Sequence, residues 1–256
     1  MDVNITNLFV SIDDKTVLKD FCLAIAKGEI HVIMGPNGVG KSTLSKVIMG
    51  DPNYLVKSGD ITCDGNSILD LSTDLRAKLG IFLAFQNPTA IEGVTNSEFL
   101  RTALTNKNKD FDLYDFIKKL DKSCQELDFN KDFVHRAINV NFSGGEKKKN
   151  EILQLKMLEP KFLILDELDS GLDVDSLQIV CKNILDYKQE HPDTSILMIT
   201  HYTRILEYLK PDYVHVLKDG KIIKTGPLEL AYEIQEKGYK IFDHGTSKID
   251  EVKNYE

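Results

Sequence analysis

The chain contains the stretch Gly35-Pro36-Asn37-Gly38-Val39-Gly40-Lys41-Ser42-Thr43, directly after the apolar run Ile30 to Met34. It fits the pattern G-x-x-x-x-G-K-[ST], in which glycines let successive backbone N–H groups curl around phosphate oxygens. We expect a strand before this loop and a helix after it, whose dipole adds positive charge at the same spot. Lys41 is then placed to reach the β- and γ-phosphates of a nucleotide, and the Ser42 hydroxyl to bind Mg²⁺. An ordinary glycine-rich turn is the alternative, and both flanks argue against it.

Alternating helical and apolar segments predict an α/β core. We expect a helix over about 145–157, a strand over 162–165, a helix over about 174–190 and a strand over 196–200. Near-continuous apolar strands that alternate with helices indicate a parallel sheet covered on both faces. Residues 3–34 are expected to form short strands separated by turns.

The texture of the sequence changes between residues 88 and 140. Asn96-Ser97-Glu98 is expected to cap a helix that runs through Leu104. A second, amphipathic helix is indicated by apolar residues at helical spacing, namely Leu113, Phe116, Ile117, Leu120, Cys124 and Leu127. The chain therefore divides into a nucleotide-binding core with a β subdomain (1–87 and 141–225), an all-helical insertion (88–140) and a C-terminal tail (226–256), expected to begin with a helix and then fray.

Two acidic residues, Asp166 and Glu167, follow the apolar strand Phe162 to Leu165. Open α/β sheets bind ligands beyond the carboxyl ends of their strands, so this pair is expected to face the phosphate loop. Successive strand residues point in opposite directions, which suits a division of labour. We predict that Asp166 holds Mg²⁺ through water and that Glu167 polarises the water that attacks the γ-phosphate. Two solvated acids are the alternative, which the upstream phosphate loop disfavours.

Two further polar residues are candidates for the same site. Gln86 follows the apolar run Ile81 to Phe85 and precedes Pro88, so it can touch the metal and the attacking water from a hinge. A polar residue that caps a strand is the plainer interpretation of Gln86. His201 follows the expected strand that ends at residue 200, and it can donate a hydrogen bond to the γ-phosphate. The other five histidines receive no role.

A second group of small residues, Ser143-Gly144-Gly145-Glu146-Lys147, lies further along the chain. By itself such a stretch is only a turn that opens a helix. Its place between the phosphate loop and Asp166 predicts a second nucleotide-contacting surface, which cannot reach the nucleotide of its own chain. Another copy must then complete the chemistry. The stretch Ser170 to Asp173 is expected to meet its twin across such a dimer, and Asp173 to cap the next helix.

Composition argues against several classes of function. The 256 residues carry a formal net charge of −8, which argues against nucleic-acid binding through the phosphate backbone. The four cysteines are scattered without a C-x-x-C pair, which predicts reduced thiols rather than a disulfide framework or a zinc site. We see no signal peptide and no apolar run of about 20 residues, so no direct membrane insertion is expected. The expected location is cytoplasmic, with a plastid-type organelle also open.

Together these segments resemble the ABC-type ATPase family over nearly the whole chain. The resemblance implies an α/β fold with a RecA-like parallel-sheet core, an antiparallel β subdomain and a helical insertion. It also implies hydrolysis of ATP with Mg²⁺. In this comparison Gln86 matches the Q-loop, His201 the switch histidine and residues 143–146 the signature. The resemblance further implies a transient, ATP-dependent head-to-tail dimer, in which Ser143, Gly144, Gly145 and Glu146 meet the γ-phosphate held by Lys41 of the other copy.

A closer resemblance is to the SufC-type branch, the ATPases of SUF iron–sulfur cluster assembly. Residues 142–150, F-S-G-G-E-K-K-K-N, are similar to its F-S-G-G-E-K-K-R-N and depart from the L-S-G-G-Q of transporters. Residues 166–173 are similar to its D-E-x-D-S-G-L-D. The resemblance implies SufB-like and SufD-like scaffold partners, bound near Gln86 and moved by ATP-driven closure.

Three positions depart from the family patterns. Glu92 replaces a usual proline and Lys149 an arginine, and neither is expected to touch nucleotide. Ile12 stands where many transporter ATPases place an aromatic residue that stacks on adenine, so base selectivity is expected to be loose.

Two other functions compete with this interpretation. A nucleotide-binding subunit of a membrane transporter is the nearer alternative, and the S-G-G-E-K signature weighs against it. An ATP-gated binding module without hydrolysis is disfavoured by Glu167 and His201. A separate hypothesis holds that one of Lys147 to Lys149 pairs with Glu167 when no partner is bound; a solvated basic run is the alternative.

Overall fold

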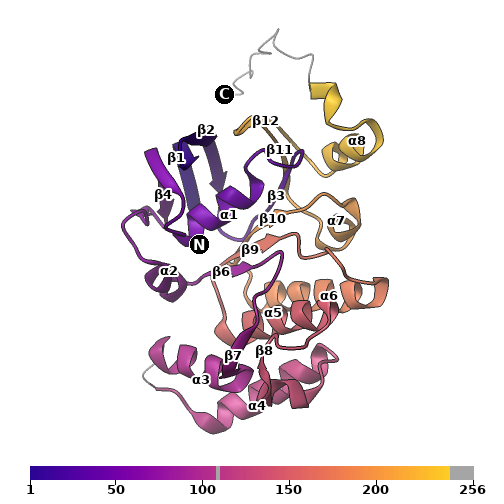
Figure 1. Ribbon diagram of the computed structural model, residues 1–256. Helices are drawn as coiled ribbons and strands as arrows, with labels where there is room; N and C mark the ends of the chain where they lie inside the picture. Colours follow the sequence, from indigo (N-terminus) through magenta and orange to yellow (C-terminus); the bar gives the residue numbers. More distant parts are fainter. Residues whose placement is uncertain (108–109, 243–256) are drawn as a thin grey trace.

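A six-stranded sheet lies at the centre of the molecule (Figure 1), whose computed structural model describes residues 1–107 and 110–242. In spatial order its strands are β12 (Lys221–Gly226), β11 (Tyr213–Lys218), β3 (Ile30–Met34), β10 (Ser195–Ile199), β9 (Phe162–Asp166) and β6 (Ile81–Ala84). Strands β11, β3, β10, β9 and β6 are parallel, and β12 joins the edge in the antiparallel sense. The predicted parallel sheet is confirmed.

The two faces of this sheet contribute to two hydrophobic cores. Every residue of β3, β9 and β10 is buried, as expected for parallel strands covered on both sides. Along β3, Val32 and Met34 belong to the core that includes helices α5 (Gly144–Leu158), α6 (Val174–Glu190) and α7 (Thr203–Leu209). Ile33, which lies between them in sequence, belongs to the core around helix α1 (Lys41–Met49).

The N-terminal part of the chain forms an antiparallel sheet. Its strand order is β2 (Lys15–Ile25), β1 (Val3–Ile12), β4 (Leu55–Cys63) and β5 (Asn66–Ser67). Buried side chains of β1 and β2, including Ile5, Leu8 and Phe21, join the core around α1. Residues 13 and 14 form the expected turn between β1 and β2.

Helix α2 (Thr73–Leu79) lies between the antiparallel sheet and β6 in the sequence, and its Arg76 is buried. The Arg76 guanidinium donates to the carbonyl oxygens of Val47 and Ile48 at 2.8 and 2.9 Å, at the C-terminal end of α1. Carbonyl groups at a helix C-terminus carry partial negative charge, which compensates the buried cation. Arg76 therefore ties α1 to the helix that leads into β6.

The insertion over 88–140 is not all-helical, which corrects the prediction. It contains α3 (Asn96–Lys107), α4 (Leu113–Glu126) and the 3₁₀ helix η1 (Lys131–His135), and also two short paired strands, β7 (Ile91–Thr95) and β8 (Ala137–Ile138). The division of the chain at 87/88 and 140/141 stays a prediction.

The expected cap of α3 also shifts by one residue. Thr95, the last residue of β7, accepts a hydrogen bond from Glu98 N at 3.2 Å, and the Glu98 carboxylate accepts one from Thr95 N at 3.0 Å. This reciprocal arrangement is a capping box. Asn96, which the sequence suggested as the cap, is buried, and its amide donates to the Phe133 carbonyl at 2.9 Å.

Helix α4 is amphipathic, as predicted, but its apolar face is narrower than expected. Phe116, Leu120 and Cys124 are buried in the core. Leu113 and Ile117 leave 52% and 51% of their surface exposed. The helical spacing in the sequence therefore identified the helix but assigned two exposed residues to its buried face.

The tail begins with the predicted helix, α8 (Glu229–Lys237), followed by the 3₁₀ helix η2 (Tyr239–Phe242). The predicted fraying concerns residues 243–256, which lie outside the described residues. All four cysteines are free thiols, and Cys63, Cys124 and Cys181 are buried. Within residues 1–107 and 110–242, no helix has the length and apolarity needed to cross a membrane.

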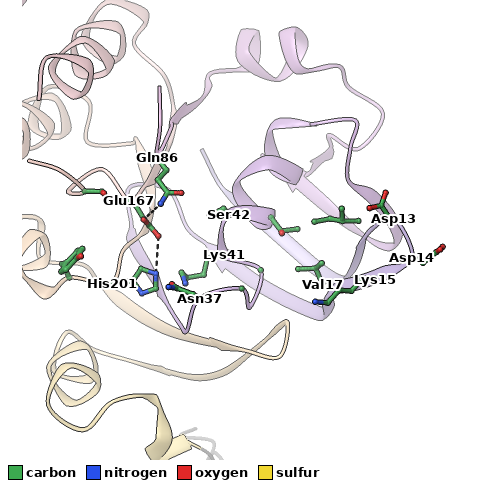
Figure 2. Close-up of a pocket in the computed structure, with 16 residues that line it drawn as sticks. Asp13, Asp14, Lys15, Val17, Asn37, Lys41, Ser42, Gln86, Glu167 and His201 are labelled. Atoms are coloured by element: carbon green, nitrogen blue, oxygen red, sulfur yellow. Dashed lines mark hydrogen bonds and ion pairs between the residues drawn. The ribbon is translucent and has the colours of Figure 1, made fainter. Parts of the chain in front are cut away.

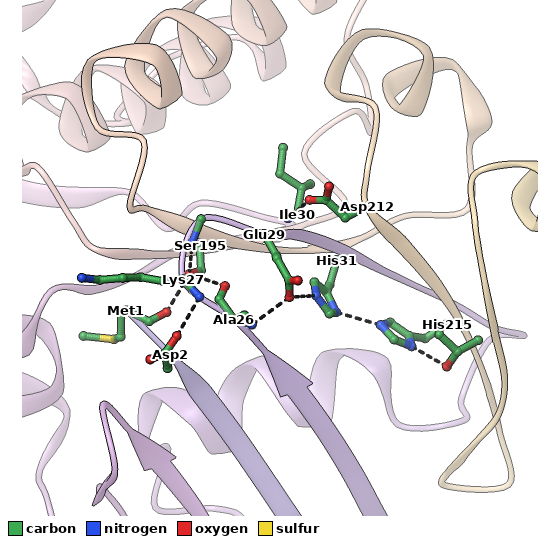
Figure 3. Close-up of polar contacts among 12 residues, drawn as sticks. Met1, Asp2, Ala26, Lys27, Glu29, Ile30, His31, Ser195, Asp212 and His215 are labelled. Carbon is green, nitrogen blue, oxygen red and sulfur yellow. Dashed lines mark hydrogen bonds and ion pairs between the residues drawn. The ribbon is translucent and has the colours of Figure 1, made fainter. Parts of the chain in front are cut away.

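Two histidines without a predicted role form a buried polar chain between β3, β11 and β12 (Figure 3). His31 lies 2.8 Å from Glu29 and 2.9 Å from His215, and His215 lies 2.8 Å from the Thr225 hydroxyl. Burial, with a smaller contribution from His31, lowers the pKa of His215 to about 4, so this ring is neutral near pH 7. These contacts give buried polar side chains of β3, β11 and β12 hydrogen-bond partners.

Candidate nucleotide-binding site

A cleft of 1090 Å³ opens beside the phosphate loop (Figure 2). Its walls include residues of the loop and three of the predicted site residues, Gln86, Glu167 and His201. These three come from the segments after β6, β9 and β10, so the carboxyl ends of three parallel strands meet here, as the sequence indicated.

The opposite end of the cleft contains residues that the sequence did not single out. Asp13, Asp14, Lys15 and Val17 line the cleft together with Ile12, and Figure 2 shows the first four far from Glu167. They belong to the turn between β1 and β2 and to the first residues of β2, more than 20 positions before Lys41 in the sequence. No local pattern marks this turn as part of a site, because only the packing of the antiparallel sheet brings it here.

The shape of the phosphate loop depends on two of its glycines. A Cβ atom on Gly35 would lie 2.3 Å from the Leu217 carbonyl oxygen, at the end of β11. Gly40, directly before α1, has φ 111°, a conformation that side chains rarely adopt. The loop therefore passes close to β11 and turns sharply into the helix, as the predicted motif requires.

Lys41 is buried at the centre of the loop. Its ammonium donates to the carbonyl oxygens of Gly35 and Pro36 at 2.7 and 2.8 Å. Burial lowers the pKa of Lys41 to about 8, although Glu167 and Asp166 favour the charged form. An anion bound beside this ammonium would raise that pKa again, which is the electrostatic property of a phosphate site.

Asp166 lies beneath the cleft and fits the role of a metal-binding residue. One carboxylate oxygen accepts a hydrogen bond from the Ser45 hydroxyl at 2.8 Å. The other oxygen is buried and has no hydrogen-bond partner among the described residues. Burial, with a smaller contribution from the charge of Glu167, raises the pKa of Asp166, and the hydrogen bond from Ser45 acts in the opposite direction. An unpartnered buried carboxylate oxygen next to Ser42 suits Mg²⁺ or its bound water, because Mg²⁺ prefers oxygen ligands.

Glu167 is directed into the cleft between Gln86 and His201. The Gln86 amide donates to one oxygen of Glu167, and His201 Nε2 lies 3.4 Å from the other. His201 Nε2 makes no hydrogen bond among the described residues. The Glu167 backbone has φ 47°, an uncommon conformation that often marks functional residues.

Burial and the charge of Lys41 lower the pKa of His201, and these effects outweigh the attraction of Glu167. His201 is therefore neutral near pH 7, with one ring nitrogen able to donate and the other to accept.

The hypothesis that Lys147, Lys148 or Lys149 pairs with Glu167 is wrong for this structure. Lys148 contacts the Phe85 carbonyl oxygen and Glu151, and Lys149 donates to the Asp128 carbonyl oxygen at 3.0 Å. No described contact joins Lys147 to Glu167. All three lysines lie on α5. Their distance from Glu167 in the sequence does not reveal where this helix places their side chains.

The second predicted surface forms a separate cavity of 470 Å³ at the start of α5. Ser143, Gly144, Gly145 and Glu146 all line it, together with Lys149 and with residues at the start of α6. The two cavities share no lining residue, so the structure does not bring residues 143–146 to the cleft that contains Lys41. Lys149, to which the sequence gave no contact with nucleotide, forms part of this wall.

A capping box fixes the start of α5. The Ser143 hydroxyl accepts a hydrogen bond from Glu146 N at 3.3 Å, and the Glu146 carboxylate accepts one from Ser143 N at 2.6 Å. In the same cavity wall, Asp173 caps α6 as predicted, because its carboxylate accepts a hydrogen bond from Ser176 N at 2.7 Å.

Comparison with known proteins identifies the family. The sequence matches the family described as ABC transporter over residues 18–170. A probable ABC transporter ATP-binding protein of Streptococcus pyogenes serotype M18 is 50% identical over 240 residues, which cover 93% of both chains. The chain belongs to the ABC transporter ATPase family. It is also similar to the probable ATP-dependent transporter ycf16 of Trieres chinensis, with 48% identity over 243 residues that cover 93% of this chain and 96% of that relative.

Solved structures agree with this ABC ATPase fold. The ATP-binding subunit of an ABC transporter has a TM-score of 0.77 at 23% identity, and covers 95% of this chain and 97% of its own. A dimeric ATP-binding cassette in a post-hydrolysis state, bound to ADP and phosphate, has a TM-score of 0.75 at 22% identity. The match covers 88% of this chain and 98% of that cassette. The predicted fold is confirmed, and the chain is an ABC-type ATPase that uses ATP and Mg²⁺.

If Asp166 holds the metal, Asp166→Asn raises the Mg²⁺ concentration needed for half-maximal ATP hydrolysis by about tenfold or more, because it removes one negative charge from the metal environment. A Mg²⁺ titration of the hydrolysis rate measures the shift. Asp212→Asn is a matched control, since Asp212 accepts a hydrogen bond from Ile30 N at the other end of the sheet. An unchanged Mg²⁺ requirement in Asp166→Asn contradicts the assignment.

Proposed function

We propose that this ABC-type ATPase drives a scaffold like SufB and SufD in iron–sulfur cluster assembly. The observation that carries the proposal is the segment 142–150, in which E-K-K-K-N follows S-G-G, together with D-E-L-D-S-G-L-D over 166–173. Both are similar to the SufC-type branch, and the first departs from the L-S-G-G-Q of transporters. The proposed location is the cytoplasm or a plastid-type organelle.

In the proposed reaction, Lys41 and the phosphate loop hold the β- and γ-phosphates of ATP, while Ser42, Gln86 and Asp166 hold Mg²⁺. Bound Mg²⁺ neutralises charge that develops on the phosphate oxygens. Glu167 accepts the proton of the attacking water. Gln86 supports this role because its hydrogen bond orients Glu167 through one carboxylate oxygen, while the other lies 3.4 Å from His201 Nε2.

His201 is proposed to donate its Nε2 proton to the γ-phosphate. Its support is the unpartnered Nε2 atom at the wall of the cleft. A neutral imidazole with its Nε2 protonated can make this hydrogen bond, and the lowered pKa of His201 favours the neutral form at physiological pH.

The second cavity supports a head-to-tail dimer of this chain. The residues at the start of α5 offer unpaired N–H groups of the first helical turn and the positive end of a 15-residue helix, which together attract an anion. Ser143, Gly144 and Gly145, next to Glu146, are proposed to bind the γ-phosphate held by a second copy. A dimeric structure is known for an ABC transporter cassette at 22% identity.

The dimer makes turnover dependent on protein concentration: we expect the ATPase rate per subunit to rise as the isolated chain is concentrated. Ser143→Asp should lower the rate by about 10² or more, because a carboxylate repels the γ-phosphate while it still caps α5. ATP binding to the phosphate loop should be unchanged. Steady-state phosphate release and nucleotide-binding titrations measure both quantities.

Ser143→Asn is the matched control, because asparagine also caps a helix and carries no charge. A rate that is high and independent of concentration, or that Ser143→Asp leaves intact, overturns the dimer.

The surface near Gln86 is proposed as the docking site of the scaffold. An apolar cleft of 290 Å³ lies between α2, α3 and the end of α5, and contains Phe82 and Phe99. Large apolar side chains are exposed beside it and near Gln86, namely Leu75, Leu79, Phe85, Ile91 and Val94. Exposed apolar side chains gathered around a cleft are typical of protein-binding surfaces.

Co-purification from the source cell, followed by mass spectrometry, tests the proposed partner. We expect iron–sulfur scaffold proteins, and we expect Leu79→Glu to lose them without a change in the ATPase rate of the isolated chain. Leu113→Glu, the same change at an exposed leucine of α4, should retain them.

Recovery of a membrane-spanning subunit in place of a scaffold overturns the SUF proposal. It would favour the second candidate function, a nucleotide-binding subunit of a membrane transporter. The names of the relatives support that candidate, because they describe transporters or their ATP-binding proteins.

A further inference from the structure

Helix α5 holds the chain immediately before Gln86. Phe85 follows the edge strand β6, and both of its backbone polar groups bond to side chains of α5. Its N–H donates to the Glu151 carboxylate at 2.6 Å, and its carbonyl oxygen accepts a hydrogen bond from the Lys148 ammonium. Lys148 and Glu151 also pair with each other at 3.3 Å. The Lys148–Glu151 ion pair thus holds both backbone polar groups of Phe85, the residue before Gln86.

The same helix holds the chain after Gln86 through a second, independent contact. Asn150, one position before Glu151, donates to the Asn139 side-chain oxygen at 3.0 Å. The Asn139 amide in turn donates to the Thr89 carbonyl oxygen at 3.0 Å. Both asparagines are buried. The exposed segment that contains Gln86 is therefore anchored to α5 at Phe85 and at Thr89.

Stability alone gives a poor account of the ion pair. The Lys148 and Glu151 side chains are 3% and 4% exposed. Buried ion pairs lose much of their attraction to desolvation, and apolar replacements of similar size are often as stable. Here burial raises the pKa of Glu151 to about 7, against the attraction of Lys148. Burying this ion pair costs free energy of desolvation, yet both of its side chains bond to the backbone of Phe85. This favours a role in positioning that backbone.

We infer that Lys148, Glu151 and Asn139 are positioning residues that hold Gln86 against Glu167. The inference rests on the proposed roles of Gln86 and Glu167 in hydrolysis. Because Ser143 caps α5, the helix that presents the signature to a second copy also carries anchors of its own Gln86 segment. Lys148 lies five residues, or about 7.5 Å along the helix axis, from Ser143. A shift of α5 on pairing would therefore move Gln86.

A double-mutant cycle tests the inference on the full chain. Glu151→Leu removes the acceptor of the Phe85 N–H and keeps a side chain of similar size, whereas Glu151→Gln retains an acceptor. We expect Glu151→Leu to lower kcat for ATP hydrolysis by about tenfold, with the KM for ATP changed less than about twofold, and Glu151→Gln to retain most of the rate. When combined with Gln86→Ala, Glu151→Leu should cause no further loss, because it acts through Gln86.

Asn139→Gly provides a second variant in case Glu151→Leu does not fold. Asn139 has φ 58°, which glycine tolerates, so this change removes the Thr89 anchor with little backbone cost. It should show the same loss of kcat and the same absence of further loss with Gln86→Ala. Lys156→Met is the matched control. Lys156 also lies on α5, but it pairs with Glu126 of α4 at 2.6 Å, away from Gln86. This variant should retain kcat.

The outcomes separate the inference from the proposed function. If Gln86→Ala lowers kcat but the losses with Glu151→Leu and Asn139→Gly add to it, the anchors are only structural and the inference fails alone. The inference fails in the same way if both anchor variants fold and retain kcat. If Gln86→Ala itself retains full kcat, the proposed role of Gln86 fails and the inference fails with it.

Discussion

The account depends on one geometric constraint: Lys41 and Ser143 of the same chain line different cavities. Lys41 is the first residue of α1, directly after the phosphate loop, and Ser143 caps α5 at a cavity that shares no lining residue with the first. A triphosphate bound at Lys41 therefore lacks the donors of its own α5. We propose that hydrolysis at this site uses a second surface, and the start of α5 in a second copy of this chain offers one of the right chemistry.

The two cavities are nevertheless mechanically connected within the chain. The stretch Ser170 to Asp173 begins in the wall of the first cavity and continues into that of the second. Helix α5 carries the signature at its start and, within the next two turns, the residues that hold the backbone on both sides of Gln86. These connections give the molecule a physical route by which contact at one surface can alter the geometry of the other.

Local patterns in the sequence predicted the phosphate loop, the buried strands and the acidic pair, because each leaves its pattern within a short stretch of residues. The glycine spacing around Lys41 fixes the loop, and four apolar residues before Asp166 fix a buried strand. The sequence missed features set by tertiary contacts. Thr95 rather than Asn96 caps α3, and Thr95 lies in β7, whose pairing with β8 no local pattern indicated. Lys148 contacts the Phe85 carbonyl oxygen and Glu151 rather than Glu167.

The most direct test of the separate half-sites is a structure of the Glu167→Gln variant with ATP and Mg²⁺, in which slow hydrolysis should preserve the triphosphate. The account predicts that the γ-phosphate lies between Lys41 of one copy and Ser143 of another. A triphosphate enclosed by residues of one polypeptide, with Ser143 of every copy facing solvent, would contradict it.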